Sequence, residues 1–529
     1  MKQLKTTIKS TLALTVLAAS ICQAQSAAQT DTVSVETLRR VGTVDEHFQS
    51  YNVEMLEVTG GKFWKPYAAI KNPSVTEKAD SGSTPSGMDP SLYAYRAPLD
   101  LTNPRLRHLA AALAPAYVRA SGTWANNTYF AESETPPSAP PTGFNGVLSQ
   151  QQWKGLIEFS NAVDAPIVTS FATGPGVRND KGVWSPEQAQ HFLTYTQSLG
   201  GHIAAAEFMN EPTVAAMGGA PAGYDASAYG KDFKVFHTFM RKAAPKILIL
   251  GPGSVGESDG AWGVGYGGLS IIATADLLKA AGPGVDAFSY HHYGAVSQRC
   301  APMAQTTEQA ALSEEWLTRT DQTLSFYQKQ RDTFEPGKPM WLTEVADASC
   351  GGNPWAATFR DTFRYIDQLG RLAKQGVQVV AHNTLVASDY GLLDENTFAP
   401  KPNYWGALLW SKFMGSTVLD SGIENRAGLH TYAQCMKGTP GGVVVLAINT
   451  DVKNSQTIDL SQASQRYTLA STSDLASKNV ALNGKELSLG ANDELPQLSG
   501  AQTAAGNVKL EPTTITFLTL PKANNKACL

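Results

Sequence analysis

The sequence predicts an α/β protein in which a (β/α)₈ TIM barrel is followed by an antiparallel β-sandwich. Between residues 46 and 394, short apolar runs alternate with longer helical patterns. After about residue 415 the pattern changes to short β-branched runs separated by Asn, Gly and Pro. At 529 residues the chain is long enough for one large domain and one smaller domain.

Eight apolar runs are predicted to be the barrel strands. They lie at 49–56, 116–122, 165–174, 203–212, 246–253, 285–294, 338–347 and 377–389. Helical patterns separate them. The clearest covers 358–374, where aromatic and aliphatic residues recur at helical spacing and Gly376 follows as a stop. A barrel of this kind places its active-site residues at the C-terminal ends of the strands.

The β-sandwich is predicted over 416–529 and the barrel over 48–415. Alternating runs lie at 441–450, 466–471, 480–489 and 513–520. An N-terminal segment, 28–47, contains a strand near Thr32–Val41 that we expect to pair with the sandwich. The proline-rich segment 133–143 is expected to be an extended surface loop.

The first 27 residues have the pattern of a secretory signal peptide. Three lysines precede an apolar run at 11–21, and small residues follow. We therefore expect a secreted or periplasmic protein. No other segment approaches membrane-spanning length, so no membrane association is expected after signal removal. Four cysteines then remain, Cys300, Cys350, Cys435 and Cys528, and two disulfides are possible with three connectivities.

Charge and motifs exclude several functions. The signal segment contains three lysines and no acidic residue, so its removal leaves a formal charge of −7, which disfavours nucleic-acid binding. Residues 251–256, "GPGSVG", match a dinucleotide-binding fingerprint, but the next helical pattern starts only near Leu269. We expect no cofactor, and the sequence indicates no oligomeric state.

Two strands end in glutamates. The fourth run finishes "EFMNEP", with Asn210, Glu211 and Pro212, and the seventh delivers Glu344, 133 residues later. Glycoside hydrolysis requires such a pair, one carboxylic acid to protonate the leaving oxygen and one carboxylate to attack or to activate water. We predict that Glu211 and Glu344 are catalytic. Asn210 is expected to bond the sugar 2-hydroxyl, and nearby negative charge is expected to raise the pKa of Glu211.

The sixth run ends "SYHHYG". Adjacent histidines on a strand point to opposite faces, so a shared metal is disfavoured, and we expect one packed histidine and one at the site, His291. Tyr293 is predicted to hold the carboxylate of Glu344 by a phenolic hydrogen bond. The aromatic residues of the first βα loop, Phe63, Trp64 and Tyr67, fit loop packing and a sugar platform equally well.

The chain resembles the heparanase-like β-glucuronidases of the retaining (β/α)₈ glycosidases over nearly all of its mature length. The resemblance rests on "LRHLAAALAPAYVRASGT", "MNEP", "SYHHYG", "WLTEVADASCGG" and the long stretch 387–419. It implies that Glu211 is the general acid/base and Glu344 the nucleophile. It also implies that Cys435 and Cys528 form a C-terminal disulfide. Whether Cys300 and Cys350 pair stays open.

The resemblance also implies a substrate-binding set. Tyr390 and backbone amides around Ser388 and Gly351 would hold the uronate carboxylate, and Glu54 would contact sugar hydroxyls. Ser388 and Cys350 stand where heparanase has glycine, and heparanase's excised basic linker is missing.

We therefore expect a retaining β-glucuronidase whose partner is a glucuronic-acid-containing saccharide or glycosaminoglycan. Exo-acting cleavage is favoured, because the segment starting at Gly146 contains a single Lys where heparanase is basic, and because the long first loop is able to wall off one side of the mouth. The alternatives are endo-acting cleavage of heparan sulfate or a related glycosaminoglycan, a non-catalytic glycan-binding protein, and a neutral-sugar glycosidase.

Overall fold

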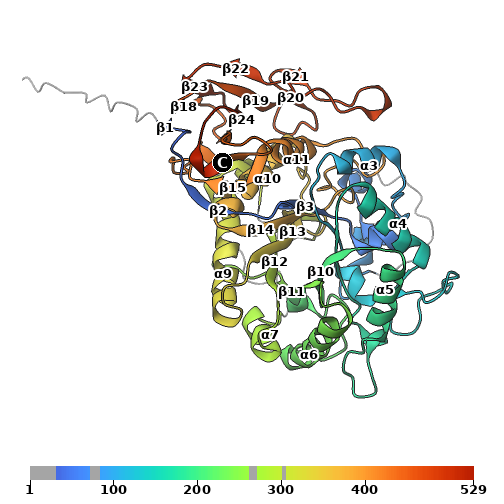
Figure 1. Ribbon diagram of the computed structural model, residues 1–529. Coiled ribbons are helices and arrows are strands. Elements are labelled where there is room, and N and C mark those ends of the chain that lie inside the picture. Colours follow the sequence, from blue (N-terminus) through green and yellow to red (C-terminus); the bar gives the residue numbers. More distant parts are fainter. Residues whose placement is uncertain (1–30, 72–83, 261–270, 301–305) are drawn as a thin grey trace, which may run out of the picture.

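In this computed structural model, eight parallel strands close into a barrel, and the predicted fold class is confirmed (Figure 1). Residues 31–71, 84–260, 271–300 and 306–529 are described, so the predicted signal peptide lies outside the described residues. Each of the eight predicted runs overlaps one barrel strand, and three of the strands continue one or two residues past the predicted end. These strands are β3 (Gln49–Asn52), β6 (Val118–Ala120), β9 (Ile167–Ser170), β10 (Ile203–Glu207), β11 (Leu248–Ser254), β12 (Ala287–Val296), β13 (Met340–Ser349) and β14 (Val377–His382).

Helices follow every barrel strand in the chain. They are α1 (Met55–Thr59), α2 (Tyr67–Lys71), α3 (Pro104–Ala111), α4 (Gln150–Ala162), α5 (Glu187–Ser198), α6 (Ala226–Ala243), α7 (Thr274–Ala281), α8 (Glu314–Leu317), α9 (Arg319–Phe334), α10 (Phe359–Lys374) and α11 (Pro402–Phe413). The glycine motif at 251–256 lies at the end of β11 and beyond it, and α7 begins only at Thr274, so no helix opens inside the motif as dinucleotide binding requires. The predicted start near Leu269 lies outside the described residues.

Side-chain alternation fills the barrel in layers. One buried cluster includes Tyr117, Ala205 and Trp341, with the rings of Tyr117 and Trp341 stacked 5.3 Å apart. Two residues further along these strands, the inward positions are occupied by Arg119, Glu207 and Thr343, which bond to one another. The barrel interior thus changes from apolar to charged toward its C-terminal mouth.

Strands β12 and β13 are longer than their barrel partners. They remain paired beyond the mouth, where Ala295 lies opposite Ala348 and Val296 opposite Ser349. Just past both ends, Cys300 and Cys350 form a disulfide with a Cα–Cα distance of 6.4 Å. The pairing that the sequence left open is therefore present, and it joins the loops that follow β12 and β13.

Two further sheets form the sandwich. The larger has the order β2 (Arg40–Thr43), β15 (Met414–Leu419), β16 (His430–Met436), β17 (Val443–Asn449), β24 (Thr514–Leu520), β19 (Ser464–Ser471), β20 (Val480–Leu482) and β21 (Lys485–Glu486), with β22 (Ala501–Thr503) also pairing with β19. The smaller contains β1 (Asp31–Val33), β18 (Gln456–Leu460) and β23 (Gly506–Leu510). The single strand expected near Thr32–Val41 is two strands, one in each sheet, because a turn interrupts it after Val33.

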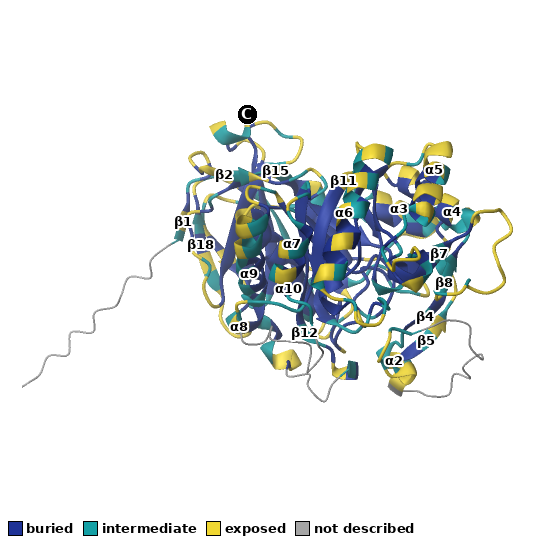
Figure 2. Cartoon of the chain, turned by 90° about the horizontal axis from the view of Figure 1, so that it is seen from below, coloured by how far each residue is buried: buried dark blue, intermediate teal, exposed yellow. Residues whose placement is uncertain are grey.

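Strand β17 shows how the sandwich joins the barrel. Val443, Val445 and Ala447 pack with the small sheet, while Val444, Leu446 and Ile448 belong to the core shared with the barrel helices. Helix α10 is therefore buried on nearly all sides, in contrast to the outer helices α4 and α5 (Figure 2). Cys435 and Cys528 form a disulfide with a Cα–Cα distance of 5.3 Å.

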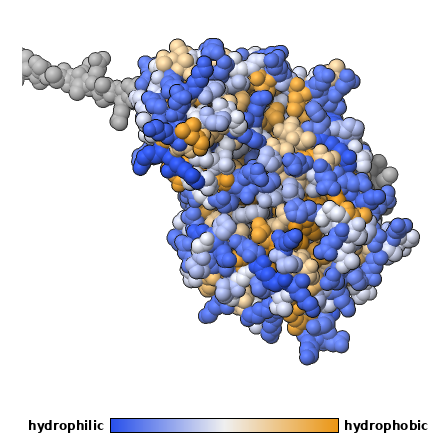
Figure 3. All heavy atoms as spheres, viewed as in Figure 1, coloured by the Kyte–Doolittle hydropathy of each residue, from blue (hydrophilic) through white to orange (hydrophobic). Residues whose placement is uncertain are grey.

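Two small two-stranded sheets lie in the loops that follow β3 and β6. They are β4 (Gly61–Trp64) with β5 (Tyr93–Arg96), and β7 (Thr128–Phe130) with β8 (Gly146–Leu148). The proline-rich segment 133–143 is a largely exposed loop between β7 and β8. On the face drawn in Figure 3, hydrophobic residues appear in small groups among hydrophilic ones. Among the described helices, none has both the length and the apolar character that crossing a membrane would require.

Candidate active site

Glu211 lies four residues beyond the last residue of β10, at the barrel mouth. Its backbone is left-handed (φ 50°, ψ 59°), and Pro212 opens a short 3₁₀ helix, Pro212–Val214, directly after it. The carboxyl group therefore emerges between the end of β10 and the start of this 3₁₀ helix. Glu211 is buried, and its Oε1 lies 3.1 Å from His291 Nδ1.

Burial is the main reason why the pKa of Glu211 is raised, to about 7. The positive charge of Arg119 opposes this rise, and the negative charge of Glu207 adds to it. The expected direction is therefore found, but desolvation has a larger effect than the nearby negative charge.

Glu344 lies inside β13, not at its end, because β13 continues for five residues beyond it. The register against β14 shifts between Leu342 and Val345, and this irregularity lets the consecutive residues Thr343 and Glu344 both reach the interior. The phenol of Tyr293 donates to Glu344 Oε1 at 2.5 Å, as the sequence predicted. The guanidinium of Arg119 donates to Glu344 Oε2 at 2.9 Å.

Carboxylate oxygens of Glu211 and Glu344 lie within 4.8 Å of each other, with His291 between them. His291, Glu211 and Glu344 also have the donor types of a metal site. At this point, however, Arg119 supplies positive charge, 2.9 Å from Glu344 and 3.3 Å from His291 Nε2. The two carboxyl groups are thus close enough to act on one sugar carbon and on the oxygen attached to it.

A buried ion pair, Arg119 with Glu207, organises the site, and the sequence analysis did not single it out. Arg119 Nη2 donates to Glu207 Oε2 at 2.8 Å and to Asn210 Oδ1 at 2.8 Å. Burial opposes ionisation of Glu207, but the charges of Arg119 and His291 and the hydrogen bonds from Arg119 and Thr343 together outweigh it and lower the pKa of Glu207. The guanidinium thereby holds Glu344 and Asn210 in fixed positions.

Asn210 presents an unsatisfied donor. Its Oδ1 is taken by Arg119, while its Nδ2 is buried and has no hydrogen-bond partner among the described residues. The Asn210 backbone is fixed by Asn126, whose side chain bonds both its N–H and its C=O at 3.0 Å. An amide held in this way beside Glu211 suits a sugar hydroxyl.

The two adjacent histidines separate as expected. His291 faces Glu211, and His292 packs away from the site with its Nδ1 2.9 Å from Thr323 Oγ1. Burial lowers the pKa of His291 to about 4, so this imidazole is neutral near pH 7.

Tyr390 is linked to Tyr293, the partner of Glu344, through Asn383, whose Nδ2 donates to the Tyr293 phenol at 3.0 Å and to the Tyr390 phenol at 3.1 Å. Further out, Ser388 Oγ donates to the carbonyl of Gly351 at 2.8 Å. Both residues have left-handed backbones. The structure thus brings Tyr390, Ser388 and Gly351 to one wall of the mouth.

Glu54 lies between β3 and α1, near both Glu344 and Tyr390: after burial, the charge of Glu54 is the main cause of the raised pKa of the Tyr390 phenol. Burial, and then the charge of Glu344, raise the pKa of Glu54 itself, and Arg119 opposes this. A Cβ on Gly122 would lie 1.5 Å from Glu54 Oε2, so only glycine fits there. Glu54 Oε2 has no hydrogen-bond partner among the described residues, which leaves it able to accept from a sugar hydroxyl.

The aromatic residues of the first loop do not form an open platform. Phe63 is buried against Trp124, and Trp64 stacks on Tyr93. Tyr67 lies under the guanidinium of Arg299, 4.2 Å from ring centroid to Cζ. The packing interpretation is therefore the right one for Phe63. Tyr67 stacks against the guanidinium of Arg299.

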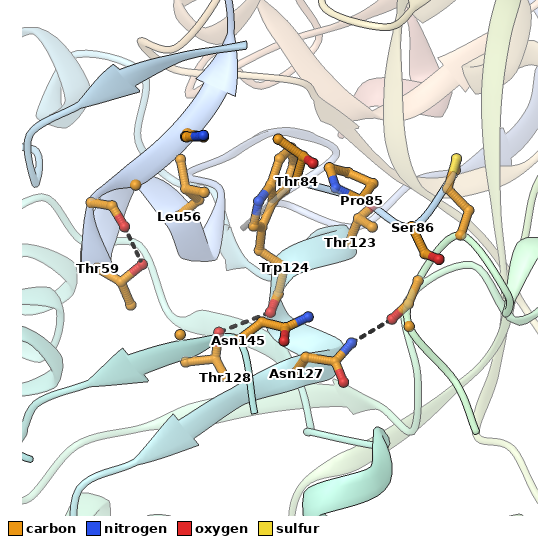
Figure 4. Close-up of a pocket in the computed structure, with 17 residues that line it drawn as sticks. Leu56, Thr59, Thr84, Pro85, Ser86, Thr123, Trp124, Asn127, Thr128 and Asn145 are labelled. Carbon is orange, nitrogen blue, oxygen red and sulfur yellow. Dashed lines mark hydrogen bonds between the residues drawn. The ribbon is translucent and has the colours of Figure 1, made fainter. Parts of the chain in front are cut away.

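A separate pocket lies between the loops that follow β3, β6 and β10 (Figure 4). It has about 590 Å³ of empty space, part of it continuous with the solvent. Its lining is mostly small and polar, with Trp124 on one side and Asn127, which donates to the Gly218 carbonyl, below. Such a lining offers hydrogen-bond partners to a saccharide.

The sequence matches one protein family, and several named proteins are similar to it. Residues 90–370 match the model described as glycosyl hydrolase family 79, N-terminal domain. Heparanase-like protein 1 of Arabidopsis thaliana is 26% identical, with 94% of each chain covered. Hyaluronoglucuronidase of Hirudo nipponia is 27% identical over 81% of this chain and 92% of the relative. Heparanase of Mus musculus is 27% identical over 81% and 88%.

Among solved structures, the α-L-arabinofuranosidase of Thermotoga maritima has a TM-score of 0.61 at 14% identity. The match covers 93% of this chain and 99% of the enzyme, and it supports the shared fold alone.

Proposed function

The chain belongs to glycosyl hydrolase family 79, and from this premise we propose that it is a β-glucuronidase acting with retention of configuration. The observation that carries the proposal is the approach of Glu211 and Glu344 oxygens to within 4.8 Å at the barrel mouth. Retaining enzymes have carboxyl groups about 5 Å apart, whereas inverting enzymes separate them by roughly 6.5–9.5 Å to hold a water. The short spacing supports direct attack by one carboxylate.

In the first step, Glu344 attacks the anomeric carbon while the bond to the leaving oxygen breaks and Glu211 gives that oxygen its proton. Arg119 and Tyr293 orient the Glu344 carboxylate through one hydrogen bond on each oxygen. With its pKa near 7, Glu211 is largely protonated at mildly acidic pH, as a general acid requires.

In the second step, water attacks the anomeric carbon of the glycosyl ester, and the bond to Glu344 breaks. Glu211, now ionised, takes the proton from that water. Neutral His291 stands 3.1 Å from Glu211 and is able to bond the carboxyl group in both states. The Asn210 amide donates to the 2-hydroxyl, where a hydrogen bond strengthens as positive charge develops at the neighbouring carbon.

The uronate carboxylate is assigned to the wall formed by Tyr390, Ser388 and Gly351. Glu54, which lies near Tyr390 and Glu344, would accept from a ring hydroxyl. The fixed position of the Tyr390 phenol relative to Glu344, through Asn383 and Tyr293, supports this placement, since it sets the sugar's C5 substituent and C1 at a constant separation.

We favour exo-acting cleavage, with removal of a terminal glucuronic acid. The first βα loop reaches across the mouth, where the Tyr67 N–H donates to Asp389 Oδ2 at 3.2 Å and the Tyr67 hydroxyl accepts from the Arg299 N–H at 3.2 Å. A loop fixed in this way closes one side of an otherwise open cleft. Endo-acting cleavage of a glycosaminoglycan is the alternative, supported by the names of the relatives, heparanase and hyaluronoglucuronidase.

Product analysis tests this proposal. We expect early release of free glucuronic acid from p-nitrophenyl β-glucuronide and from the non-reducing ends of heparan sulfate oligosaccharides. Release of intermediate-sized oligosaccharides with little free glucuronic acid would establish endo-acting cleavage. Proton NMR of the first sugar released, before mutarotation, should show the β-anomer, and an initial α-anomer would rule out retention.

Replacing Glu211 by Gln tests the acid/base role. Because only poor leaving groups need the proton, we expect a loss on the order of 10²–10⁴-fold for an alkyl glucuronide and a much smaller loss in the first step for p-nitrophenyl glucuronide. In the unmodified enzyme, hydrolysis of the alkyl substrate should fall as pH rises through about 7, the pKa of Glu211. Equal losses on both substrates, with an unchanged pH profile, would contradict the assignment.

We also propose that the protein functions outside the cytoplasm. The disulfides Cys300–Cys350 and Cys435–Cys528 require an oxidising compartment to form and persist. The predicted signal peptide agrees with export. Mass spectrometry of the protein from the native host, without reduction, should show both cross-linked peptides and a mature N-terminus near residue 28.

A further inference from the structure

Arg299 is a buried arginine that the proposed mechanism does not use. It follows β12, and its side chain is only 1% exposed. Nη2 bonds Asp389 Oδ2, whereas Nε and Nη1 are buried without a hydrogen-bond partner among the described residues. A guanidinium leaves N–H groups unsatisfied in a buried position at considerable cost, so these donors point to a missing acceptor.

The position of Arg299 is fixed from three directions. Tyr67 stacks against its guanidinium, and Asp389 accepts from it. The next residue, Cys300, is tied by the disulfide to Cys350, which adjoins Gly351. The disulfide therefore links the backbone that carries Arg299 to the backbone that carries the assigned uronate site.

Arg299 lies directly beside Gly351. A Cβ added to Gly351 would meet Ser388 Oγ at 2.7 Å and Arg299 Nη1 at 2.8 Å. Gly351 has φ +77°, so glycine is required both by the backbone conformation and by this close approach. The influence of Arg299 extends to Tyr390, where burial raises the pKa of the phenol and the arginine's charge opposes the rise.

We propose that Arg299 is a specificity-determining residue that selects an anionic substituent, the carboxylate of a terminal uronic acid, at the Gly351–Tyr390 wall. This inference rests on the proposed function. In a site with low effective dielectric, a buried positive charge near a carboxylate favours it over a neutral hydroxymethyl group by on the order of 10- to 100-fold. Tyr390 and backbone amides alone offer only dipoles for this choice.

Asp389 provides the control that separates charge from architecture. It is paired with Arg299 and partly exposed, and its negative charge weakens the field that Arg299 produces at the wall. If the pair merely holds the loop together, removing either partner should have the same effect. If Arg299 acts by its charge, removing Arg299 should lower the preference for an anionic substrate, and removing Asp389 should maintain or raise it.

The experiment compares kcat/KM for p-nitrophenyl β-glucuronide and p-nitrophenyl β-glucoside. We expect Arg299→Gln to lower the glucuronide-to-glucoside ratio 10- to 100-fold, Arg299→Lys to preserve most of it, and Asp389→Asn to maintain or raise it. An unchanged ratio in Arg299→Gln, or a fall of similar size in Asp389→Asn, would overturn the proposal. If Arg299→Gln does not fold, Arg299→Lys and Asp389→Asn decide by the same ratios.

Failure of the proposed function is recognised separately. A wild-type enzyme that cleaves neither glycoside would overturn the β-glucuronidase assignment. Saturation-transfer NMR with D-glucuronate and D-glucose as probes then decides the role of Arg299. Selective binding of glucuronate that is lost in Arg299→Gln supports the proposal, and equal binding of both sugars by the wild-type protein overturns it.

Discussion

Replacement of Glu344 by Gln is expected to lower turnover of p-nitrophenyl β-glucuronide by about 10⁴-fold or more, the scale seen when an enzyme loses its nucleophile. The amide has nearly the same shape but cannot form the glycosyl ester. Arg119 and Tyr293 both donate toward this side chain, so Gln will also place its amide hydrogens against at least one of these donors. Steady-state kinetics with the purified variant measure the loss.

Two controls make this result interpretable. Glu335→Gln alters another buried glutamate, which accepts from the Gly284 and Val285 N–H groups away from the mouth, and it should leave kcat nearly unchanged. In Glu344→Ala, a small anion such as azide is expected to occupy the vacated space and attack the anomeric carbon, yielding the α-glucuronosyl azide. Wild-type activity in a folded Glu344→Gln variant would eliminate Glu344 as the nucleophile.

The barrel and one catalytic candidate, Glu211, could be predicted from the local sequence pattern. Each of the eight runs is a buried parallel strand, and such strands are nearly continuously apolar, so Asn210 and Glu211 stand out at the end of "IAAAEFM". The Pro that follows them opens a short 3₁₀ helix, five residues past the last residue of β10. Local sequence therefore sufficed wherever the signal and the function lay on the same element.

Arg119 and Glu207 show what local pattern misses. Each is a single charged residue inside an apolar run, and their pairing joins β6 to β10, which lie apart in sequence and are not adjacent in the barrel. Opposite charges inside two buried runs are the signal that could have found them, because buried charges are nearly always paired. The shift that turns both Thr343 and Glu344 inward depends on strand register, which no local pattern encodes.

Arg299 was missed for a different reason. In the sequence it is a polar residue in a loop, where solvation is the ordinary outcome. Its burial results from Tyr67 in the first loop, Asp389 in the eighth and the disulfide to Cys350. These three long-range contacts bury Arg299 and fix its position, and none of them can be read from the local sequence "SQRC".

A second large effect is expected at the junction between barrel and sandwich, where Asp367 of α10 is buried. Its Oδ1 accepts from His430 Nδ1 at 2.6 Å and from the Tyr432 hydroxyl at 2.5 Å, and its Oδ2 accepts from Arg371 Nε at 2.6 Å. Burial opposes ionisation of Asp367, but the charges of His430 and Arg371 and the hydrogen bonds from His430 and Tyr432 together lower its pKa to about 2. Burial likewise disfavours charge on His430, yet Asp367 and the hydrogen bond to Glu314 raise the pKa of His430 to about 9.

These shifts set a pH window for stability. Because the pKa of His430 is raised in the folded state, its contribution is complete below about 6.5 and is lost as pH rises through about 9. The contribution of Asp367, whose pKa is lowered, is complete above about 3.9 and is lost as pH falls toward 2. The pair therefore stabilises the junction most between roughly pH 4 and 6.5.

Asp367→Asn should lower the free energy of unfolding by about 3–5 kcal/mol at pH 6, because it removes the fully buried counter-charge of His430 and Arg371 and leaves them only the partly exposed Glu314 and Asp321. Urea unfolding followed by circular dichroism measures this loss. The same variant should show a shallower decline in stability between pH 6.5 and 9, since His430 no longer gains a proton on folding to the same extent. Glu158→Gln, which removes an exposed i,i+4 partner of Lys154, is the matched control and should change stability by less than about 0.5 kcal/mol. A loss in Asp367→Asn no larger than in this control, or a decline above pH 6.5 as steep as in the wild type, would show that the buried pair does not fasten the sandwich to the barrel.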